Sequence, residues 1–405
     1  MHNTIFRHIV RLITDSNISG IDEAAMILSL MIIFLLIIIS PILSNRIRLP
    51  VIVVEIIMGI IIGESLLNII PMNPVLDFLS SFGLIYLMFL VGLEINLREI
   101  RGHVIKTLSI AISSILIPFI CGFTISYHIN VDPLLLGTIF TTTSLGIILP
   151  LTRDISYSQE FNHILLVSVA IVDVISIFLL AFSLSIIEGM LEASFMYSLI
   201  AILVLFFIPT IINKMKSLGL SQKIENWMLQ EHHFEMGVRL AFALIVILAT
   251  ISWHLGFHSI IGAFIAGLII SELLPEASLL KKKLDSFGYG FFIPLFFIIM
   301  GSKVNLPLLF SNIVNISNLL IIIIIAIISK VIGVFLASRT VGFSFRESAS
   351  LGLFHSARVS LIIAAAEIGS DLGLIDESLF SILIILAVMS ALIGPSIGKY
   401  LLLNK

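Results

Sequence analysis

One aspartate, Asp173, lies near the middle of an apolar run that is long enough to cross a lipid bilayer. The run covers residues 161–187, and Asp173 is its only Asp, Glu, Lys or Arg. An ionised carboxylate at that depth costs about 2.5 to 3.5 kcal/mol even on insertion scales that give low values. Asp173 therefore needs a bound ion, a proton or a charged partner. Carboxylate oxygens suit hard cations, and desolvation disfavours the charged form, so protons can compete with a cation for this group.

The preceding apolar run, 133–151, is interrupted by hydroxyl side chains. It contains Thr142, Thr143 and Ser144, and a glycine and a proline follow them. Such residues allow an interrupted membrane helix to satisfy its freed backbone groups and to offer oxygen atoms to an ion. A polar break followed by a lone aspartate at membrane depth predicts an ion site. The alternative is a Thr/Ser cluster that packs helices together beside a structural salt bridge.

The composition places these elements in a membrane protein. Of the 405 residues, 59% are hydrophobic and only 12% are charged, whereas about a quarter of the residues in soluble domains are charged. The predicted fold is all-α and polytopic, with about 13 transmembrane helices, short connections and no soluble regulatory domain. The predicted spans are, in order, roughly 24–43, 50–67, 76–94, 104–126, 133–151, 162–187, 194–213, 234–252, 257–273, 287–303, 317–338, 346–369 and 376–402.

The placement of Lys and Arg predicts the orientation. Basic residues gather in the loops after the odd-numbered spans, and the positive-inside rule assigns those loops to the cytoplasm. We therefore expect a multi-pass protein of the cell membrane with a cytoplasmic C-terminus and an external N-terminal segment, 1–23. Arg7 and Arg11 in that segment disagree with this assignment. The basic loop residues include Arg46, Arg48, Arg98, Arg101, Lys214, Lys216, Lys281, Lys282, Lys283, Arg339 and Arg346.

Two similar stretches indicate an internal repeat. MGIIIGE (58–64) aligns with AGLIISE (266–272), 208 residues further on. The first stretch lies in span 2 and the second in span 9, so spans 1–6 correspond to spans 8–13, with span 7 (194–213) as the connector. An odd offset inverts the second copy, which is the plan of many secondary transporters. Span 12 then pairs with span 5, and it too carries polar residues at its centre, including Ser356 and Arg358.

The chain resembles the monovalent cation:proton antiporters, in the branch that includes bacterial and archaeal sodium/proton and Kef-type antiporters. The resemblance covers nearly the whole chain, and it rests on the order and spacing of several motifs together with the span around Asp173. These motifs are RIRLPVIVVEIIMGIIIG (46–63), FLVGLEINLREI (89–100), TTTSLGI (141–147), GAFIAGLIISE (262–272), PLFFIIMGSKVNL (294–306) and SKVIGVFLASRTVGFSFRES (329–348).

The resemblance implies an architecture and a set of site residues. It implies a dimerisation domain, and hence a homodimer, together with a core domain in which spans 5 and 12 unwind and cross beside Asp173. It also implies a basic residue in span 11, which falls on Lys330. We expect Lys330 to be a charge partner in the core; the alternative is a lysine that snorkels to the membrane interface.

The sequence departs from this family in three places. Span 6 carries Val172 before Asp173, where the family has a second acidic or polar residue. Span 12 reads SARV (356–359), so Arg358 stands where the family has an acid. Arg358 either replaces an acid whose role was structural or pairs with Asp173 and prevents cation binding. No nucleotide-binding regulatory domain follows span 13, which argues against a ligand-gated potassium efflux system.

These observations predict a secondary antiporter that exchanges a monovalent cation, first of all Na+, for H+ by alternating access. One carboxylate in span 6 predicts electroneutral exchange. The alternatives are a K+/H+ antiporter or Kef-like protein without its regulatory domain, and a non-transporting sensor on the same scaffold. We expect Na+ (or K+ or Li+), H+ and the lipid bilayer as partners, with no nucleic acid, cofactor or metal site. Motifs of intramembrane enzymes are missing, and Cys121 is the only cysteine.

Overall fold

A computed structural model describes residues 20–70, 73–94, 104–148, 157–187, 235–254, 258–273 and 279–403, and all regular structure in these segments is helical. The predicted connector 194–213 lies outside the described residues, as do residues 1–19 of the predicted external segment. The helices are α2 (Gly20–Ile47), α3 (Val51–Ile62), α4 (Pro74–Glu94), α5 (Val104–Ile129), α6 (Pro133–Thr141), α8 (Gln159–Ile187), α11 (Met236–His254), α12 (Ser259–Leu273), α13 (Leu279–Phe287), η2 (Gly288–Phe292), α14 (Ile293–Ser302), α15 (Leu306–Ser311), α16 (Ile313–Thr340), α17 (Phe345–His355), α18 (Ser360–Asp371) and α19 (Glu377–Leu403).

The prediction of an all-helical, multi-pass membrane protein is confirmed. In the described part of the chain, nine helices or helix series are long and apolar enough to cross a membrane, and three shorter apolar helices accompany them. Together they occupy twelve of the thirteen predicted positions. The count of thirteen stays a prediction, because the remaining position is the connector.

Both predicted helix breaks are present. In span 5, α6 ends at Thr141, residues 142–144 are not helical, and a helical turn follows at 145–148. The Thr142 hydroxyl donates to the Ile139 carbonyl oxygen at 2.8 Å, so this side chain satisfies a carbonyl of the helix that it ends. In span 12, α17 ends at His355 and α18 begins four residues after Ser356.

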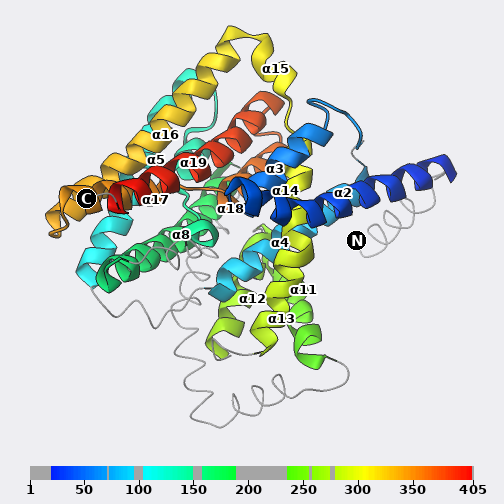
Figure 1. Ribbon diagram of the computed structural model, residues 1–405, viewed down its shortest axis with the longest axis horizontal. Coiled ribbons are helices and arrows are strands. Elements are labelled where there is room, and N and C mark those ends of the chain that lie inside the picture. Colours follow the sequence, from blue (N-terminus) through cyan, green and yellow to red (C-terminus); the bar gives the residue numbers. More distant parts are fainter. Residues whose placement is uncertain are drawn as a thin grey trace.

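The helices pack in two groups. In the first group, α4 packs on α12, α3 on α14, and α11 on α12, with α2 against α3. In the second group, α5 packs on α6, α8 and α16, while α17 packs on α16 and α19. We call these groups the first and second bundles. Figure 1 shows the second bundle on one side of the molecule and the first bundle on the other, with α18 at their boundary. Because α18 contacts α19, α8 and α6, we count it with the second bundle.

Close helix packing in the first bundle depends on glycine. A Cβ atom on Gly59 of α3 would overlap the carbonyl oxygen of Ile298 in α14, and one on Gly267 of α12 would overlap that of Phe89 in α4. Small residues let membrane helices approach in this way. The two contacts are equivalent in the proposed repeat, since Gly267 follows Gly59 by 208 residues and Ile298 follows Phe89 by 209.

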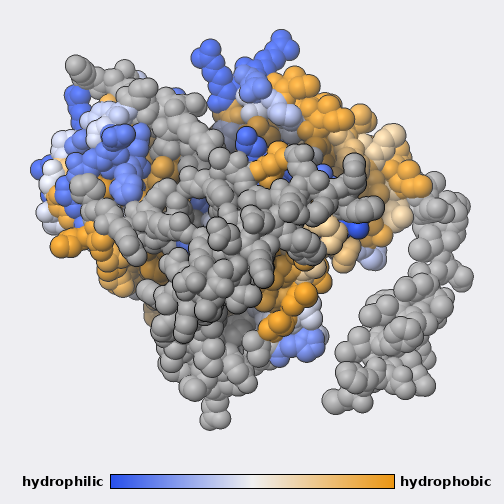
Figure 2. Space-filling view, turned by 90° about the horizontal axis from the view of Figure 1, so that it is seen from below, coloured by the Kyte–Doolittle hydropathy of each residue, from blue (hydrophilic) through white to orange (hydrophobic). Residues whose placement is uncertain are grey.

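Much of the outer surface is apolar, as a bilayer requires. Only 17% of the most apolar window of α2 is buried inside the chain, and large apolar side chains such as Ile38 and Ile42 are well exposed. Figure 2 shows broad areas of apolar residues on the surface, with hydrophilic residues gathered at separate positions. Such a surface suits contact with lipid.

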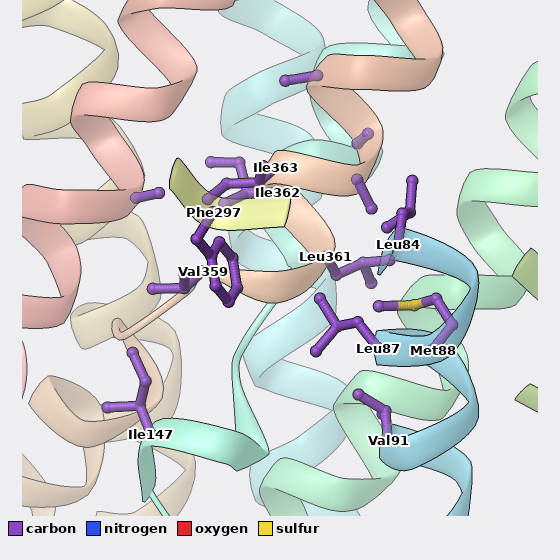
Figure 3. Close-up of a cluster of buried hydrophobic side chains, with 14 of the residues drawn as sticks. Leu84, Leu87, Met88, Val91, Ile147, Phe297, Val359, Leu361, Ile362 and Ile363 are labelled. Atoms are coloured by element: carbon purple, nitrogen blue, oxygen red, sulfur yellow. The ribbon is translucent and has the colours of Figure 1, made fainter. Parts of the chain in front are cut away.

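The contact between the two bundles is also apolar. Figure 3 shows Leu84, Leu87, Met88 and Val91 of α4 near Leu361 of α18, and all five side chains are buried. Apolar contacts of this kind are non-directional, so displacement of one surface along the other breaks no hydrogen bond of this cluster. The same cluster includes Ile147, Phe297, Val359, Ile362 and Ile363.

Candidate functional site

The structure brings Asp173 to the break in span 5. Its carboxylate is buried, accepts a hydrogen bond from the Thr143 hydroxyl at 3.0 Å, and accepts another from the Leu145 amide at 2.9 Å. Leu145 begins the helical turn after the break, so Asp173 caps the positive end of that turn. One buried carboxylate thus lies at a broken helix together with a hydroxyl oxygen, as expected for a cation site.

Lys330 lies at the opposite end of the same break. Its ammonium donates to the carbonyl oxygen of Thr141 at 2.5 Å and to that of Ser114 at 2.8 Å. Thr141 is the last residue of α6, so its carbonyl belongs to the negative end of that helix and attracts a cation. Lys330 has no exposed surface, so it does not reach the membrane interface.

Lys330 and Asp173 act on the break separately. Among the ion pairs formed by described residues, none joins these two side chains. Opposite charges at the two ends of one buried break attract each other without direct contact. The carboxylate oxygens of Asp173 are therefore held by hydrogen-bond donors that a cation could replace, and no ammonium covers them.

The three hydroxyl residues of the break have different partners. Thr143 contacts Asp173, whereas Thr142 turns back onto α6. The Ser144 hydroxyl lies 3.4 Å from that of Ser360, the first residue of α18. This contact brings the two interrupted helices together, and both of them begin a new helical segment at this point. Thr143, Ser144 and Ser360 are therefore the hydroxyls placed at the crossing.

Ser356 and Arg358 lie in the break of span 12, and their hydrogen bonds go to α17, α16 and α19. The Ser356 hydroxyl donates to the Leu353 carbonyl at 2.7 Å, within its own helix. The fully buried guanidinium of Arg358 donates to the Ala326 carbonyl of α16 at 2.8 Å, and its Nε and Nη1 have no hydrogen-bond partner among the described residues. No ion pair between Arg358 and Asp173 is formed in the described part of the chain.

Three further residues belong to this neighbourhood. Ser360 and Ser176 were not singled out from the sequence, and His355 was noted only as part of the polar break in span 12. Ser360 contacts Ser144, and the Ser176 hydroxyl lies 2.9 Å from that of Thr141. Ser176 follows Asp173 by three residues in α8, so helical spacing was a signal for it. His355 contacts two serines of other helices. No sequence spacing distinguishes it, because its partners come from distant parts of the chain.

An ion pair links the two bundles away from the break. The ammonium of Lys303, which follows α14, lies 2.8 Å from the Glu367 carboxylate of α18 and 3.1 Å from the Asp77 carboxylate of α4. Glu367 is buried. This cluster therefore ties an element of the crossing to the first bundle with a charged contact, in addition to the apolar cluster.

The donor atoms at the break favour a small, hard cation. They are carboxylate and hydroxyl oxygens, which are typical ligands of such ions, whereas transition metals are held by imidazole or thiolate groups. Within the described segments, no three His, Cys, Asp or Glu residues gather as metal ligands would. One carboxylate in this arrangement can take up either a cation or a proton.

Comparison with known proteins agrees with this architecture. A probable Na(+)/H(+) antiporter 3 of Methanocaldococcus jannaschii is 32% identical over 384 residues, covering 92% of this chain and 96% of that protein. The Na(+)/H(+)-K(+) antiporter GerN of Bacillus cereus is 29% identical, covering 88% and 91%. The solved structure of the sodium proton antiporter MjNhaP1 from M. jannaschii has the same fold, with a TM-score of 0.68, 18% identity, and coverage of 94% and 99%.

The family model described as sodium/hydrogen exchanger, transmembrane, matches residues 6–403, which is nearly the whole chain. The matched residues include the interrupted helices, the buried aspartate and the apolar surface described above. The chain belongs to the transmembrane sodium/hydrogen exchanger family.

Proposed function

We propose that this protein exchanges Na+ for H+ across the cell membrane, with Asp173 as the group that binds either ion. The observation that carries the proposal is the buried Asp173 carboxylate, which lies at a helix break beside Thr143 and forms no ion pair within the described residues. The names of the relatives in M. jannaschii and B. cereus support Na+ as the first cation to test.

The cation would replace hydrogen-bond donors at the break. Asp173, Thr143 and Ser144 offer oxygen atoms there, and rotation of the Thr143 hydroxyl would present its lone pair instead of its proton. When Asp173 takes a proton, the carboxylate becomes neutral and loses its attraction for the cation. One group therefore holds one ion at a time, which is the condition for exchange.

Exchange by alternating access requires the site to open to one side at a time. The two bundles support this proposal, because among the described residues their contact is largely apolar, with a charged cluster at Lys303. Movement of the second bundle against the first would expose Asp173 first to one side of the membrane and then to the other. The glycine contacts of α3 with α14 and α4 with α12 support the proposed inverted repeat, which supplies two related conformations.

The exchange is proposed to be electroneutral. Asp173 is the only carboxylate of its span, and Val172 occupies the neighbouring position. Asp173 is neutral with bound H+ and compensates the charge of bound Na+, so both loaded forms carry the same net charge. Each extra charge moved would be driven by about 2.3 kcal/mol per 100 mV. A sustained current after a Na+ jump on a solid-supported membrane contradicts this count.

The proposed function is tested with purified protein in liposomes that contain a pH-sensitive dye. Na+, K+ or Li+ is added to separate samples of acid-loaded liposomes. We expect Na+ to dequench the dye fluorescence, and liposomes without protein are the control. A response to K+ alone identifies the K+/H+ alternative. No response to any of the three cations supports the non-transporting alternative, in which Arg358 and Val172 mark a degenerate site.

The orientation and the homodimer remain proposals on the same basis. The basic loops after odd-numbered spans support a cytoplasmic C-terminus and an external N-terminus. Accessibility of single cysteines to a membrane-impermeant thiol reagent tests the orientation. A homodimer is proposed from the family resemblance, and mass measurement in detergent tests it.

A further inference from the structure

A buried histidine connects three helices of the second bundle. His355 is the last residue of α17 and has no exposed surface. Its Nδ1 lies 3.2 Å from the Ser114 hydroxyl of α5, and its Nε2 lies 2.9 Å from the Ser168 hydroxyl of α8. Both ring nitrogens therefore have a partner, and the two partners belong to different helices.

The hydrogen bonds suit one donor and one acceptor on the imidazole. The Ser168 hydroxyl lies 3.1 Å from the carbonyl oxygen of Leu165, to which it can donate its proton. With that proton on Leu165, Nε2–H of His355 would donate to the Ser168 oxygen, and Nδ1 would accept from the Ser114 hydroxyl. A neutral imidazole in this tautomer satisfies both serines.

Each serine is connected to one charge of the ion site. The carbonyl oxygen of Ser114 accepts from the Lys330 ammonium at 2.8 Å. Ser168 precedes Asp173 by five residues on the same helix, α8. The imidazole of His355 thus joins the residue that holds Lys330 to the helix that carries Asp173.

We propose that His355 is a positioning residue of the ion site. By holding Ser114 and Ser168, it keeps α5 and α8 in the register that sets the distance between the Lys330 ammonium and the Asp173 carboxylate. Charged groups in a binding site must be held to within about 0.5 Å, and hydrogen bonds behind the site provide this precision. The proposal rests on the proposed function, because it concerns the affinity of the same site.

The two serines offer the cleanest test, since their replacement leaves the backbone carbonyl of Ser114 and the imidazole in place. We expect Ser114→Ala and Ser168→Ala each to raise the KM for Na+ about five- to tenfold, the equivalent of one lost hydrogen bond, with the maximal rate largely retained. His355→Leu should raise KM further. Adding Ser168→Ala to His355→Leu should have little additional effect, because the bridge is already lost. His355→Gln, with a donor and an acceptor, should restore part of the affinity.

A matched control lies in the first bundle. The buried Ser40 hydroxyl of α2 contacts the Glu55 carboxylate of α3 at 3.3 Å. Ser40→Ala removes the same group from a contact between two helices that carry no residue of the ion site, so it should lower the melting temperature while leaving the KM for Na+ unchanged. The Na+-induced rise in melting temperature gives a second measure of affinity that does not depend on transport.

The outcomes separate the two proposals. If wild-type protein exchanges Na+ and is stabilised by it, but Ser114→Ala and Ser168→Ala keep the wild-type KM, His355 is only structural and the positioning role is wrong. The same conclusion follows if Ser40→Ala raises KM equally. If wild-type protein neither exchanges Na+ nor is stabilised by it, the proposed function itself is wrong. The serine variants retain His355, so they decide the matter even if His355→Leu does not fold.

Discussion

The ammonium of Lys330 lies 2.5 Å from the carbonyl oxygen of Thr141, the last residue of α6. Span 5 stops there in the middle of the molecule and leaves carbonyl groups without helical partners. On the other side of the break, Asp173 accepts from the Leu145 amide. The Lys330 ammonium and the Asp173 carboxylate therefore stabilise the unpaired backbone groups at the two ends of one interrupted helix. The carboxylate oxygens of Asp173 can still bind an ion.

Replacement of Asp173 by asparagine should abolish exchange. The amide is nearly isosteric with the carboxylate, but it can neither ionise nor carry a proton. Expression and melting temperature should stay close to wild type, and dye dequenching in liposomes should fall to the level without protein. Exchange at a near wild-type rate would mean that another group carries the ions.

Lys330→Met should destabilise the protein. The apolar side chain fills much of the space, but it leaves the carbonyls of Thr141 and Ser114 without their charged donor. A hydrogen bond to a charged group contributes about 1.5 to 3 kcal/mol, so the melting temperature in detergent should fall clearly. Lys399→Met removes a partly exposed lysine near the C-terminal end of α19 and serves as the control. Equal melting temperatures for the two variants contradict the role of Lys330 at the break.

Arg358→Glu separates the two explanations of the arginine in span 12. In the structure, Arg358 donates to the Ala326 carbonyl, and a carboxylate cannot do so. We therefore expect lower thermal stability and slower exchange in this variant, whereas Arg358→Lys, which keeps a charge and a donor, should be affected less. Faster exchange by Arg358→Glu would instead support suppression of cation binding by the arginine.

Cross-linking across Lys303 tests movement between the bundles. The background is a Cys121→Ser chain. The test pair, Lys303→Cys with Glu367→Cys, links the end of α14 in the first bundle to α18. The control pair, Lys303→Cys with Asp77→Cys, links two elements of the first bundle. A short bifunctional thiol reagent should block exchange in the first pair and leave it in the second. Full exchange after complete cross-linking of the first pair rules out alternating access by relative movement at this contact.

Gly267→Ala should loosen the packing of α12 on α4. The added methyl group would overlap the carbonyl oxygen of Phe89, and overpacking of this kind costs about 1 to 3 kcal/mol. Gly290→Ala is the matched control, because nothing lies within 4 Å of a Cβ atom at that position. The melting temperature should fall in the first variant and not in the second. The same fall in both would mean that backbone freedom, rather than contact, decides the effect.

The membrane architecture and the two helix breaks could be predicted from the amino-acid sequence. Length and apolar character identify spans because a bilayer requires about 20 apolar residues for each helix. Asp173 and the hydroxyls of span 5 were identified because polar groups are costly at membrane depth. Lys330 was expected as a charge partner of the core on the family resemblance. These are local properties of the chain, so neighbouring residues are enough to recognise them.

Only the tertiary structure decided which side chains meet. It places Lys330 on backbone carbonyls, turns Thr142 away from Asp173, and directs Arg358 toward α16. It also brings His355 to serines that are 241 and 187 residues away in the chain. Hydrogen bonds depend on positions within a few tenths of an ångström, and those positions follow from the packing of several helices at once. Hydrophobicity and spacing along one chain carry no information at that scale.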